Sequence, residues 1–383
     1  MKITDIRTFI VGNPWKNWLF VKVYTDVGIE GLGEATSGLS TKPVEAALHE
    51  MKHLAIGEDP RDIPRLMDKL YRALFLAEDS INQHAFSGLN IACWDILGKS
   101  AGLPLYRLLG GKVRDALRAY ANGWYQGPSD PVFFAKRAKE VAQIGYTALK
   151  FDPFGNSYQN LSGPEIGRAI ENVAAVREAV GPNVDILIEA HDRFSYTTAV
   201  EVGHRLEPYR PMWYETPCMS NDIDMTCEVA RQVPVPVAAG ERYTTLRQQR
   251  ALLAGGVGII QPETLSMGGI SGTLDTAALA RAYGAWVAPH CAQSPLTTAI
   301  NVHIGLSTPN VLIQECFDEF HIDWAKQVLA GCPIVKNGYL YLENENPGHG
   351  VTLDENACQA HPYSPHNFLR LFDEGWEKRR ISE

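Results

Sequence analysis

From about residue 120, short β-rich runs alternate with helical patterns, and this repetition limits the possible folds more than any other feature. The runs are YTALKFD, VDILIEAH, PMWYET, VPVAAGE, GIIQPE, AWVAPH and NVLIQE. Strands that alternate with helices are typical of a parallel sheet, because each connection must cross back over the sheet. We therefore predict an α/β domain in this part of the chain.

A titratable residue ends most of these runs at a regular interval. Successive residues are 26, 26, 22, 27 and 25 positions apart, and they are Glu189, Glu215, Glu241, Glu263, His290 and Glu315. This interval fits a stacked solenoid or a closed (β/α) barrel. Because the helical stretches vary and no repeat consensus recurs, we favour the barrel. The carboxyl ends of barrel strands meet at one face, so these residues would surround one pocket.

The first three glutamates of this series predict a metal site. Carboxylates on successive strand ends repel one another, and burying them is costly unless a cation neutralises them. Ligands that are all oxygen favour Mg²⁺, with Mn²⁺ as a substitute, over Zn²⁺. The alternative is that Glu189, Glu215 and Glu241 form ordinary salt bridges, for example between Glu241 and Arg242.

Two histidines are candidates for proton transfer. His191 follows Glu189 by two positions, and side-chain alternation along a strand predicts that it faces the same pocket while Asp192 points elsewhere. His290 ends the run AWVAPH, which is the next run after the one that ends at Glu263. A carboxylate bonded to one imidazole nitrogen fixes the tautomer and raises the basicity of the other, so we predict a Glu263–His290 dyad. The other nine histidines are expected to be packed or surface residues.

Further polar residues are candidates for substrate binding. Lys150 ends an early strand, where it could hold a substrate carboxylate, serve as a second base, or simply pair with Asp152. Asp152 is itself a candidate for substrate contact. Loops 13–18 and 36–43 offer Trp15, Lys16 and Lys42, although both stretches could equally be ordinary solvated loops.

The first 115 residues have a different pattern. Apolar and polar residues alternate around a TDVG turn, which predicts a small antiparallel meander. Three helical patterns follow, and the last of them stops at Gly102, a residue suited to a helix carboxyl end. We expect an α+β domain ahead of the barrel.

Composition narrows the class of protein. A chain of 383 residues exceeds what one small core usually holds. Its net charge of −9 disfavours nucleic acid as a partner. The start MKITDIRTFIV lacks a signal-peptide pattern, and no apolar run approaches the roughly 20 residues that span a bilayer, so we expect a cytoplasmic protein without membrane contact. The seven cysteines contain no CxxC pair and are expected to be reduced thiols.

Taken in order, several motifs resemble one protein family. They are LKFD, IEAHDRF, WYETP, AAGER, QPETLSMGGI, APHCAQSP and IQE, together with the earlier GLGEA, ACWDILGK and PLYRLLGGK. The set resembles the mandelate racemase branch of the enolase superfamily, most closely its galactonate dehydratase-like acid-sugar dehydratases, over nearly the whole chain. The resemblance implies an α+β capping domain (1–118), a (β/α)7β modified TIM barrel (119–335) and a carboxyl-terminal segment (336–383) that returns to the cap.

The resemblance also implies roles at the pocket. Mg²⁺ would be bound by Glu189, Glu215 and Glu241. His290 with Glu263 would abstract the α-proton of a sugar acid, Glu315 would hydrogen-bond its carboxylate, and His191 would protonate the departing hydroxyl. The reaction would pass through an ene-diolate to a 2-keto-3-deoxy acid. A homo-oligomer is expected, without an indication of its size.

Three positions depart from the family pattern. Glu189 stands where an aspartate is common, Thr216 where a second glutamate is frequent, and Asp152 where many members carry a lysine base. Two-base racemisation through that lysine is therefore disfavoured. Epimerisation, cycloisomerisation of a lactone, and a binding or regulatory role with a vestigial pocket stay as alternatives.

Overall fold

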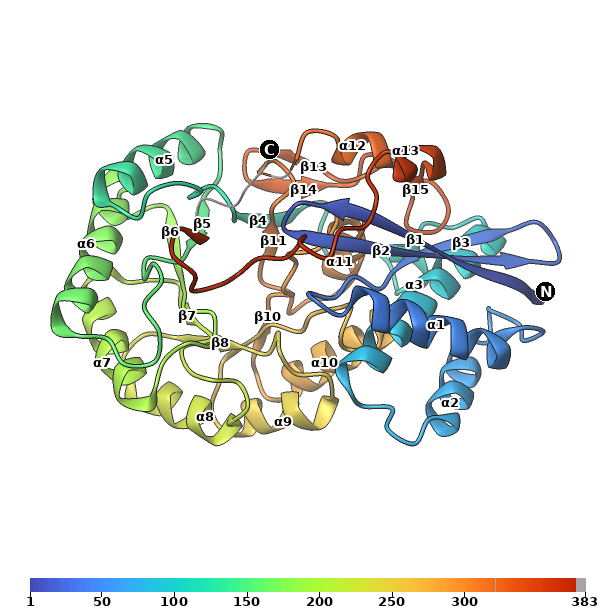
Figure 1. Ribbon diagram of the computed structural model, residues 1–383, viewed down its shortest axis with the longest axis horizontal. Helices are drawn as coiled ribbons and strands as arrows, with labels where there is room; N and C mark the ends of the chain where they lie inside the picture. The colour runs from blue at the N-terminus through green and yellow to red at the C-terminus, as the bar shows by residue number, and fades with distance from the viewer. Residues whose placement is uncertain (321, 377–383) are drawn as a thin grey trace.

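The computed structural model describes residues 1–320 and 322–376, and Figure 1 shows the course of the chain. The chain begins with an antiparallel sheet of β1 (Ile3–Asn13), β2 (Lys16–Thr25) and β3 (Glu30–Glu34). Gly28, in the predicted TDVG turn, has a φ of +78° that favours glycine. The predicted meander is thus confirmed.

Helices complete this capping domain. They are α1 (Thr41–Ala55), α2 (Ile63–Ala73), α3 (Ser80–Ala101) and α4 (Leu105–Leu108). Gly102 ends α3 with a left-handed φ of +67°, as predicted. The backbone of α3 lies directly on the sheet, since a Cβ on Gly33 would stand 2.1 Å from the carbonyl oxygen of Gly88.

Strands and helices then alternate in the predicted (β/α)7β order, and Figure 1 shows the helices surrounding the strands. The elements in chain order are β4 (Leu117–Ala121), α5 (Pro131–Gln143), β5 (Ala148–Phe151), α6 (Gly163–Val180), β6 (Asp185–Glu189), α7 (Tyr196–Leu206), the 3₁₀ turn η1 (Glu207–Tyr209), β7 (Trp213–Glu215), α8 (Ile223–Gln232), β8 (Val237–Ala239), α9 (Leu246–Ala254), β9 (Ile259–Ile260), α10 (Gly269–Ala282), β10 (Trp286–Val287), α11 (Pro295–Ser307) and β11 (Gln314–Cys316). Neighbouring strands from β4 to β10 pair in parallel, and β11 returns to pair with β4, so the barrel closes.

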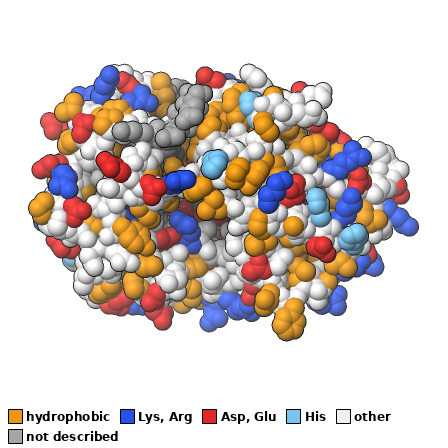
Figure 2. Space-filling model, in the orientation of Figure 1, with side chains coloured by type: hydrophobic (Ala, Val, Ile, Leu, Met, Phe, Trp, Pro, Cys, Tyr) orange, Lys and Arg blue, Asp and Glu red, His pale blue; other side chains and the backbone are white. Residues whose placement is uncertain are grey.

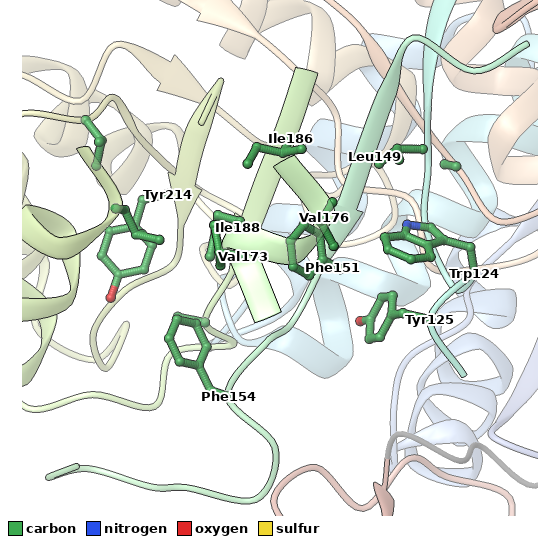
Figure 3. Close-up of a cluster of buried hydrophobic side chains, with 14 of the residues drawn as sticks. Trp124, Tyr125, Leu149, Phe151, Phe154, Val173, Val176, Ile186, Ile188 and Tyr214 are labelled. Carbon is green, nitrogen blue, oxygen red and sulfur yellow. The ribbon is translucent and has the colours of Figure 1, made fainter. Parts of the chain in front are cut away.

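Side-chain alternation divides each barrel strand between two environments. Leu149 and Phe151 on β5, with Ile186 and Ile188 on β6, pack outward against residues of α6 (Figure 3). The inward positions form an apolar layer that contains Tyr120, Ala148, Leu187, Trp213, Ala238, Ile259, Ala288 and Ile313. Two positions further along each strand, the side chain faces inward again, and there most side chains are polar. Those positions hold Asn122, Lys150, Glu189, Glu215, Gly240, Gln261, His290 and Glu315.

The chain ends with α12 (Ala325–Val328), β12 (Leu329–Ala330), β13 (Ile334–Lys336), β14 (Tyr339–Tyr341), β15 (Thr352–Leu353) and α13 (Glu355–Gln359). The β13–β14 hairpin joins the barrel sheet through β4, while Phe368 bridges to Lys16 at the start of β2. In Figure 1 this last segment, in dark red, crosses the barrel toward β6. The predicted boundaries after residues 118 and 335 each fall within a strand, and that division stays a prediction.

Polar contacts join the cap to the barrel. The carboxylate of Glu34, at the end of β3, accepts hydrogen bonds from Ser294 and Thr297 at the start of α11. All seven cysteines are free, as expected. Within residues 1–320 and 322–376, no helix is both long and apolar enough to cross a membrane.

Candidate active site

A cavity of about 440 Å³ lies at the carboxyl ends of the barrel strands. Its wall comes from three parts of the chain: the cap, the barrel, and the last described segment, which contributes Phe368, Leu369 and Leu371. Figure 2 shows this face of the molecule hollowed near its centre. Active sites of barrel enzymes occupy this end, because the loops after the strands can vary without disturbing the barrel.

The three predicted metal ligands meet at the floor of the cavity. Glu189 and Glu215 are paired neighbours at the ends of β6 and β7. Glu241 lies one position beyond the inward register, and Gly240 before it has a φ of +140°, which turns the chain there. One oxygen from each carboxylate lies within 4.8 Å of the others. A cluster of carboxylate oxygens suits a hard divalent cation, so the residues present fit such an ion.

Lys150 lies inside this acidic cluster instead of pairing with Asp152. Its Nζ is 3.1 Å from Glu189 Oε2 and 2.8 Å from Glu315 Oε1, and it also contacts Glu215. Burial lowers the pKa of Lys150, but the charges of Glu215 and Glu315 outweigh burial and hold the pKa well above its ordinary value. Lys150 is therefore a charged neighbour of the predicted metal ligands.

Glu315 is held entirely as an acceptor. Asn122 Nδ2 and the backbone N–H of Cys291 each donate to it at 2.7 Å, in addition to Lys150. Burial alone would raise the pKa of Glu315, but Lys150 and His290 lower it to about 2. An ionised carboxylate cannot donate to a substrate carboxylate, so Lys150 is the better placed donor of this pair.

The predicted Glu263–His290 pair is present in the structure. Glu263 Oε2 lies 2.7 Å from His290 Nδ1 and also accepts from Gln293 at 2.9 Å, while Oε1 accepts from the backbone of Leu265. The other ring nitrogen, Nε2, is 3.1 Å from Glu241 Oε2. Burial lowers the pKa of His290, but the charges of Glu241 and Glu315 outweigh burial and raise the pKa to about 9.

His191 reaches the cavity by a route that strand alternation does not describe. Strand β6 ends at Glu189, and both His191 and Asp192 have left-handed backbone, with φ of +53° and +58°. The backbone N–H of His191 and the hydroxyl of Thr216 both donate to Glu189 Oε1 at 2.7 Å. His191 lines the cavity, and Asp192 turns to Arg242 at 2.6 Å.

Only two of the four residues predicted to contact the substrate line the cavity. Trp15 and Lys16 line the cavity, and Lys16 Nζ donates to Ala292 O at 3.0 Å. Lys42 does not line it; its ammonium pairs with Glu45 at 2.8 Å on α1. Asp152 lies behind His191, at 2.6 Å from its Nδ1, and is also outside the lining.

Sequence reasoning missed one histidine of the cavity wall. His84, in the first turns of α3, is buried and lines the cavity from the cap side. The sequence predicts a packed or surface histidine there, because no strand end or acidic neighbour marks His84. His84 reaches the cavity because α3 packs against α10 of the barrel, a long-range contact that local sequence patterns do not contain.

Comparisons with known proteins agree with this architecture. Residues 134–357 match the family described as "Enolase C-terminal domain-like", and residues 12–110 match "Mandelate racemase / muconate lactonizing enzyme, N-terminal domain". D-gluconate dehydratase of Thermoproteus tenax is 38% identical over 92% of this chain and 71% of its own length. D-galactonate dehydratase of Xanthomonas euvesicatoria is 33% identical over 95% of both chains.

Solved structures show the same similarity. A mandelate racemase/muconate lactonizing enzyme from Jannaschia sp. CCS1 superposes with a TM-score of 0.89 at 34% identity, covering 95% of this chain and 98% of that one. The counterpart from Sulfitobacter sp. gives 0.89 at 33% identity, covering 95% and 96%. As the sequence resemblance predicted, the chain belongs to the mandelate racemase/muconate lactonizing enzyme branch of the enolase superfamily.

Proposed function

We propose that this protein is an acid-sugar dehydratase that converts an aldonate such as gluconate or galactonate to a 2-keto-3-deoxy acid. The observation that carries the proposal is the presence of two imidazoles, each hydrogen-bonded to its own carboxylate, in one cavity beside a three-glutamate cluster. Dehydration needs both a base at C2 and an acid at C3. The gluconate and galactonate dehydratases among the relatives support this choice of substrate.

Glu189, Glu215 and Glu241 would hold one Mg²⁺, or Mn²⁺ in its place. A divalent cation bound there supplies Lewis-acid stabilisation of the charge that develops on the substrate carboxylate, and it offsets the glutamate charges near His290. Lys150, within 3.1 Å of Glu189 and 2.8 Å of Glu315, would donate to the same carboxylate.

His290 would take the proton from C2 through Nε2. Glu263 holds the opposite nitrogen, which keeps the ring oriented and in one tautomer. The electron pair of the C2–H bond would move toward the substrate carboxylate and give an ene-diolate, and it would then form the C2–C3 double bond as the C3–O bond breaks. His191 would give its proton to the departing oxygen, so that one water leaves, and the resulting enol tautomerises to the keto acid.

Steady-state assays on D-gluconate and D-galactonate with Mg²⁺ test this proposal, with the 2-keto-3-deoxy acid measured directly. We expect turnover that is lost on exhaustive chelation and restored by Mg²⁺, and a fall of about 10²–10⁴-fold in His290→Asn, the usual contribution of a general base. His53→Asn on the exposed face of α1 is the matched control. Full turnover after chelation, or a C2 epimer as the product, would contradict the proposal.

A further inference from the structure

Asp152 lies on the side of His191 away from the cavity, and its contacts indicate that it orients the imidazole ring. We infer that Asp152 is a positioning residue that keeps a proton on Nδ1 of His191. The second proton of the imidazolium, on Nε2, then faces the cavity, and the neutral ring left after its donation is the Nδ1–H tautomer. The kinetic part of this inference rests on the proposed dehydratase function, in which His191 is the acid. Orientation and tautomer of the ring do not depend on that function.

The hydrogen bonds of Asp152 fix the direction of proton donation. Oδ1 accepts from the backbone N–H of Phe154 at 2.9 Å, while Oδ2 contacts both His191 Nδ1, at 2.6 Å, and Arg193 Nη2. A backbone N–H and a guanidinium can only donate. A carboxylate with such neighbours acts as an acceptor, so the bond to His191 requires the proton to be on Nδ1.

Arg193 keeps the carboxylate in place. The guanidinium is fully buried, and it donates to the carbonyl oxygens of Ala190 at 2.8 Å and Gly155 at 2.7 Å. These contacts join the loop after β6, which contains Arg193 itself, to the loop after β5. Asp152 is itself fully buried, so its charge is balanced by this partner and not by solvent.

The carboxyl-terminal segment restricts the ring from another side. Trp376 meets His191 edge to face with ring centroids 5.5 Å apart, and its Nε1 donates to Gly155 O at 2.9 Å. Phe372 lies over Arg193 at 4.5 Å. With Nδ1 bonded to Asp152 and Trp376 packed against the ring, Nε2 is the nitrogen that can reach a bound molecule.

A competing explanation is that Asp152 only neutralises Arg193. Tautomer measurement separates the two roles without substrate. We would record ¹⁵N spectra of histidine-labelled protein at a pH where the ring is neutral, and assign His191 from the signals lost in His191→Asn. The Nδ1–H form is expected in the unmodified protein and its loss in Asp152→Asn, since an amide can present N–H to the ring. An unchanged tautomer in Asp152→Asn would overturn the inference.

Isotope exchange tests the kinetic consequence. In D₂O with Mg²⁺ and gluconate, Asp152→Asn should still exchange the C2 proton through His290 while keto acid formation falls about 10–100-fold, the usual size of an effect exerted through a ligand's neighbour. KM should change little. Asp152→Asn/His191→Asn should be no slower than His191→Asn alone, because the two residues act as one unit. Additive losses, or joint loss of exchange and elimination, would argue for a merely structural role.

Folding must be controlled, because Asp152→Asn leaves a buried arginine without its charge partner. Asp152→Glu keeps the ion pair but moves the carboxylate by one methylene, and we expect it to fold, retain C2 exchange and eliminate water at least tenfold more slowly. Elimination at the unmodified rate would count against positioning. If the unmodified protein turns over no sugar acid, the proposed function fails, whereas the tautomer measurement still decides the role of Asp152.

Discussion

His84 lines the cavity, and its Nε2 is an unprotonated ring nitrogen there. Its Nδ1 donates to the carbonyl oxygen of Ser80 at 2.6 Å, since a carbonyl can only accept, and burial lowers the pKa of His84. The ring is therefore neutral, with Nε2 as a hydrogen-bond acceptor. Such a group at the cap side of the cavity is suited to a sugar hydroxyl, which is a donor.

Removal of this acceptor should weaken substrate binding and spare the chemistry. For His84→Ala we expect KM for the preferred aldonate to rise about 3–10-fold, which corresponds to one hydrogen bond of roughly 0.5–1.5 kcal/mol, with kcat nearly unchanged. Steady-state kinetics on gluconate and galactonate measure the effect. His53→Ala, on the exposed side of α1, is the control. An unchanged KM would show that the imidazole faces no substrate group.

The site residues that could be predicted from the sequence are those that follow the alternation of side chains along a strand. Glu189, Glu215 and Glu315 lie two positions beyond the apolar layer of their strands, so alternation suffices to place them. His191 lies past the end of its strand, and its left-handed backbone carries it to the cavity. No periodicity in a sequence encodes such a turn. His191 therefore lines the cavity as predicted, but through this turn and not through strand alternation.

Between elements, Glu34 connects β3 of the cap to α11 of the barrel. Its carboxylate accepts from Thr36 Oγ1 at 2.7 Å, from Ser294 through backbone N–H and Oγ at 3.1 and 2.5 Å, and from Thr297 Oγ1 at 2.7 Å. An acid is also favoured at a helix amino end, because the helix dipole is positive there. These contacts explain why a buried carboxylate is tolerated at the joint.

Glu34→Gln should destabilise the protein without changing side-chain size. The amide N–H₂ would face donors where the carboxylate accepted, and leaving buried donors unsatisfied costs about 1–3 kcal/mol. We expect the free energy of unfolding, from denaturant titration, to fall by that amount. Glu50→Gln, exposed on α1, should change it by less than about 0.5 kcal/mol. Equal effects in the two variants would show that Glu34 does not stabilise the contact between the cap and the barrel.

The order of elements was easier to predict than their extent. Strand-ending acids marked β6, β7 and β11, whereas β9 and β10 contain only two residues each, and Glu263 lies well past the end of β9 at Ile260. The β13–β14 hairpin, which extends the barrel sheet beyond β4, was not anticipated. Its pairing is a long-range contact that local patterns do not contain.

At the scale of the whole molecule, the buried histidine His303 on α11 makes stability dependent on pH. His303 Nδ1 accepts from the backbone of Tyr106 at 3.2 Å, and Nε2 donates to His349 O at 3.2 Å, an arrangement that only a neutral ring can make. Burial lowers the pKa of His303 to about 3. An unfolded histidine binds a proton near pH 6.5, so the unfolded chain binds more protons below that value.

Stability should therefore fall as pH is lowered from about 6.5 toward 3, by up to about 1.4 kcal/mol per pH unit for this group. His303→Gln preserves one acceptor and one donor but cannot titrate, so its free energy of unfolding should decline less steeply. Denaturant titrations at several pH values in this range measure both slopes. His53→Gln, on the exposed side of α1, should keep the steeper one. Equal slopes for His303→Gln and the unmodified protein would contradict this assignment.

The meeting of residues 15–17 with residues 364–371 at the cavity has a consequence for synthesis on the ribosome. Asn17 Nδ2 donates to Ser364 O at 2.8 Å, a contact that spans 347 positions, and Lys16 pairs with Phe368 next to it. A wall begun by β1 and β2 is thus finished by residues 364–371, which are synthesised long after those strands. A growing chain can close its barrel before then, but its pocket stays open on one side until translation has passed Leu371.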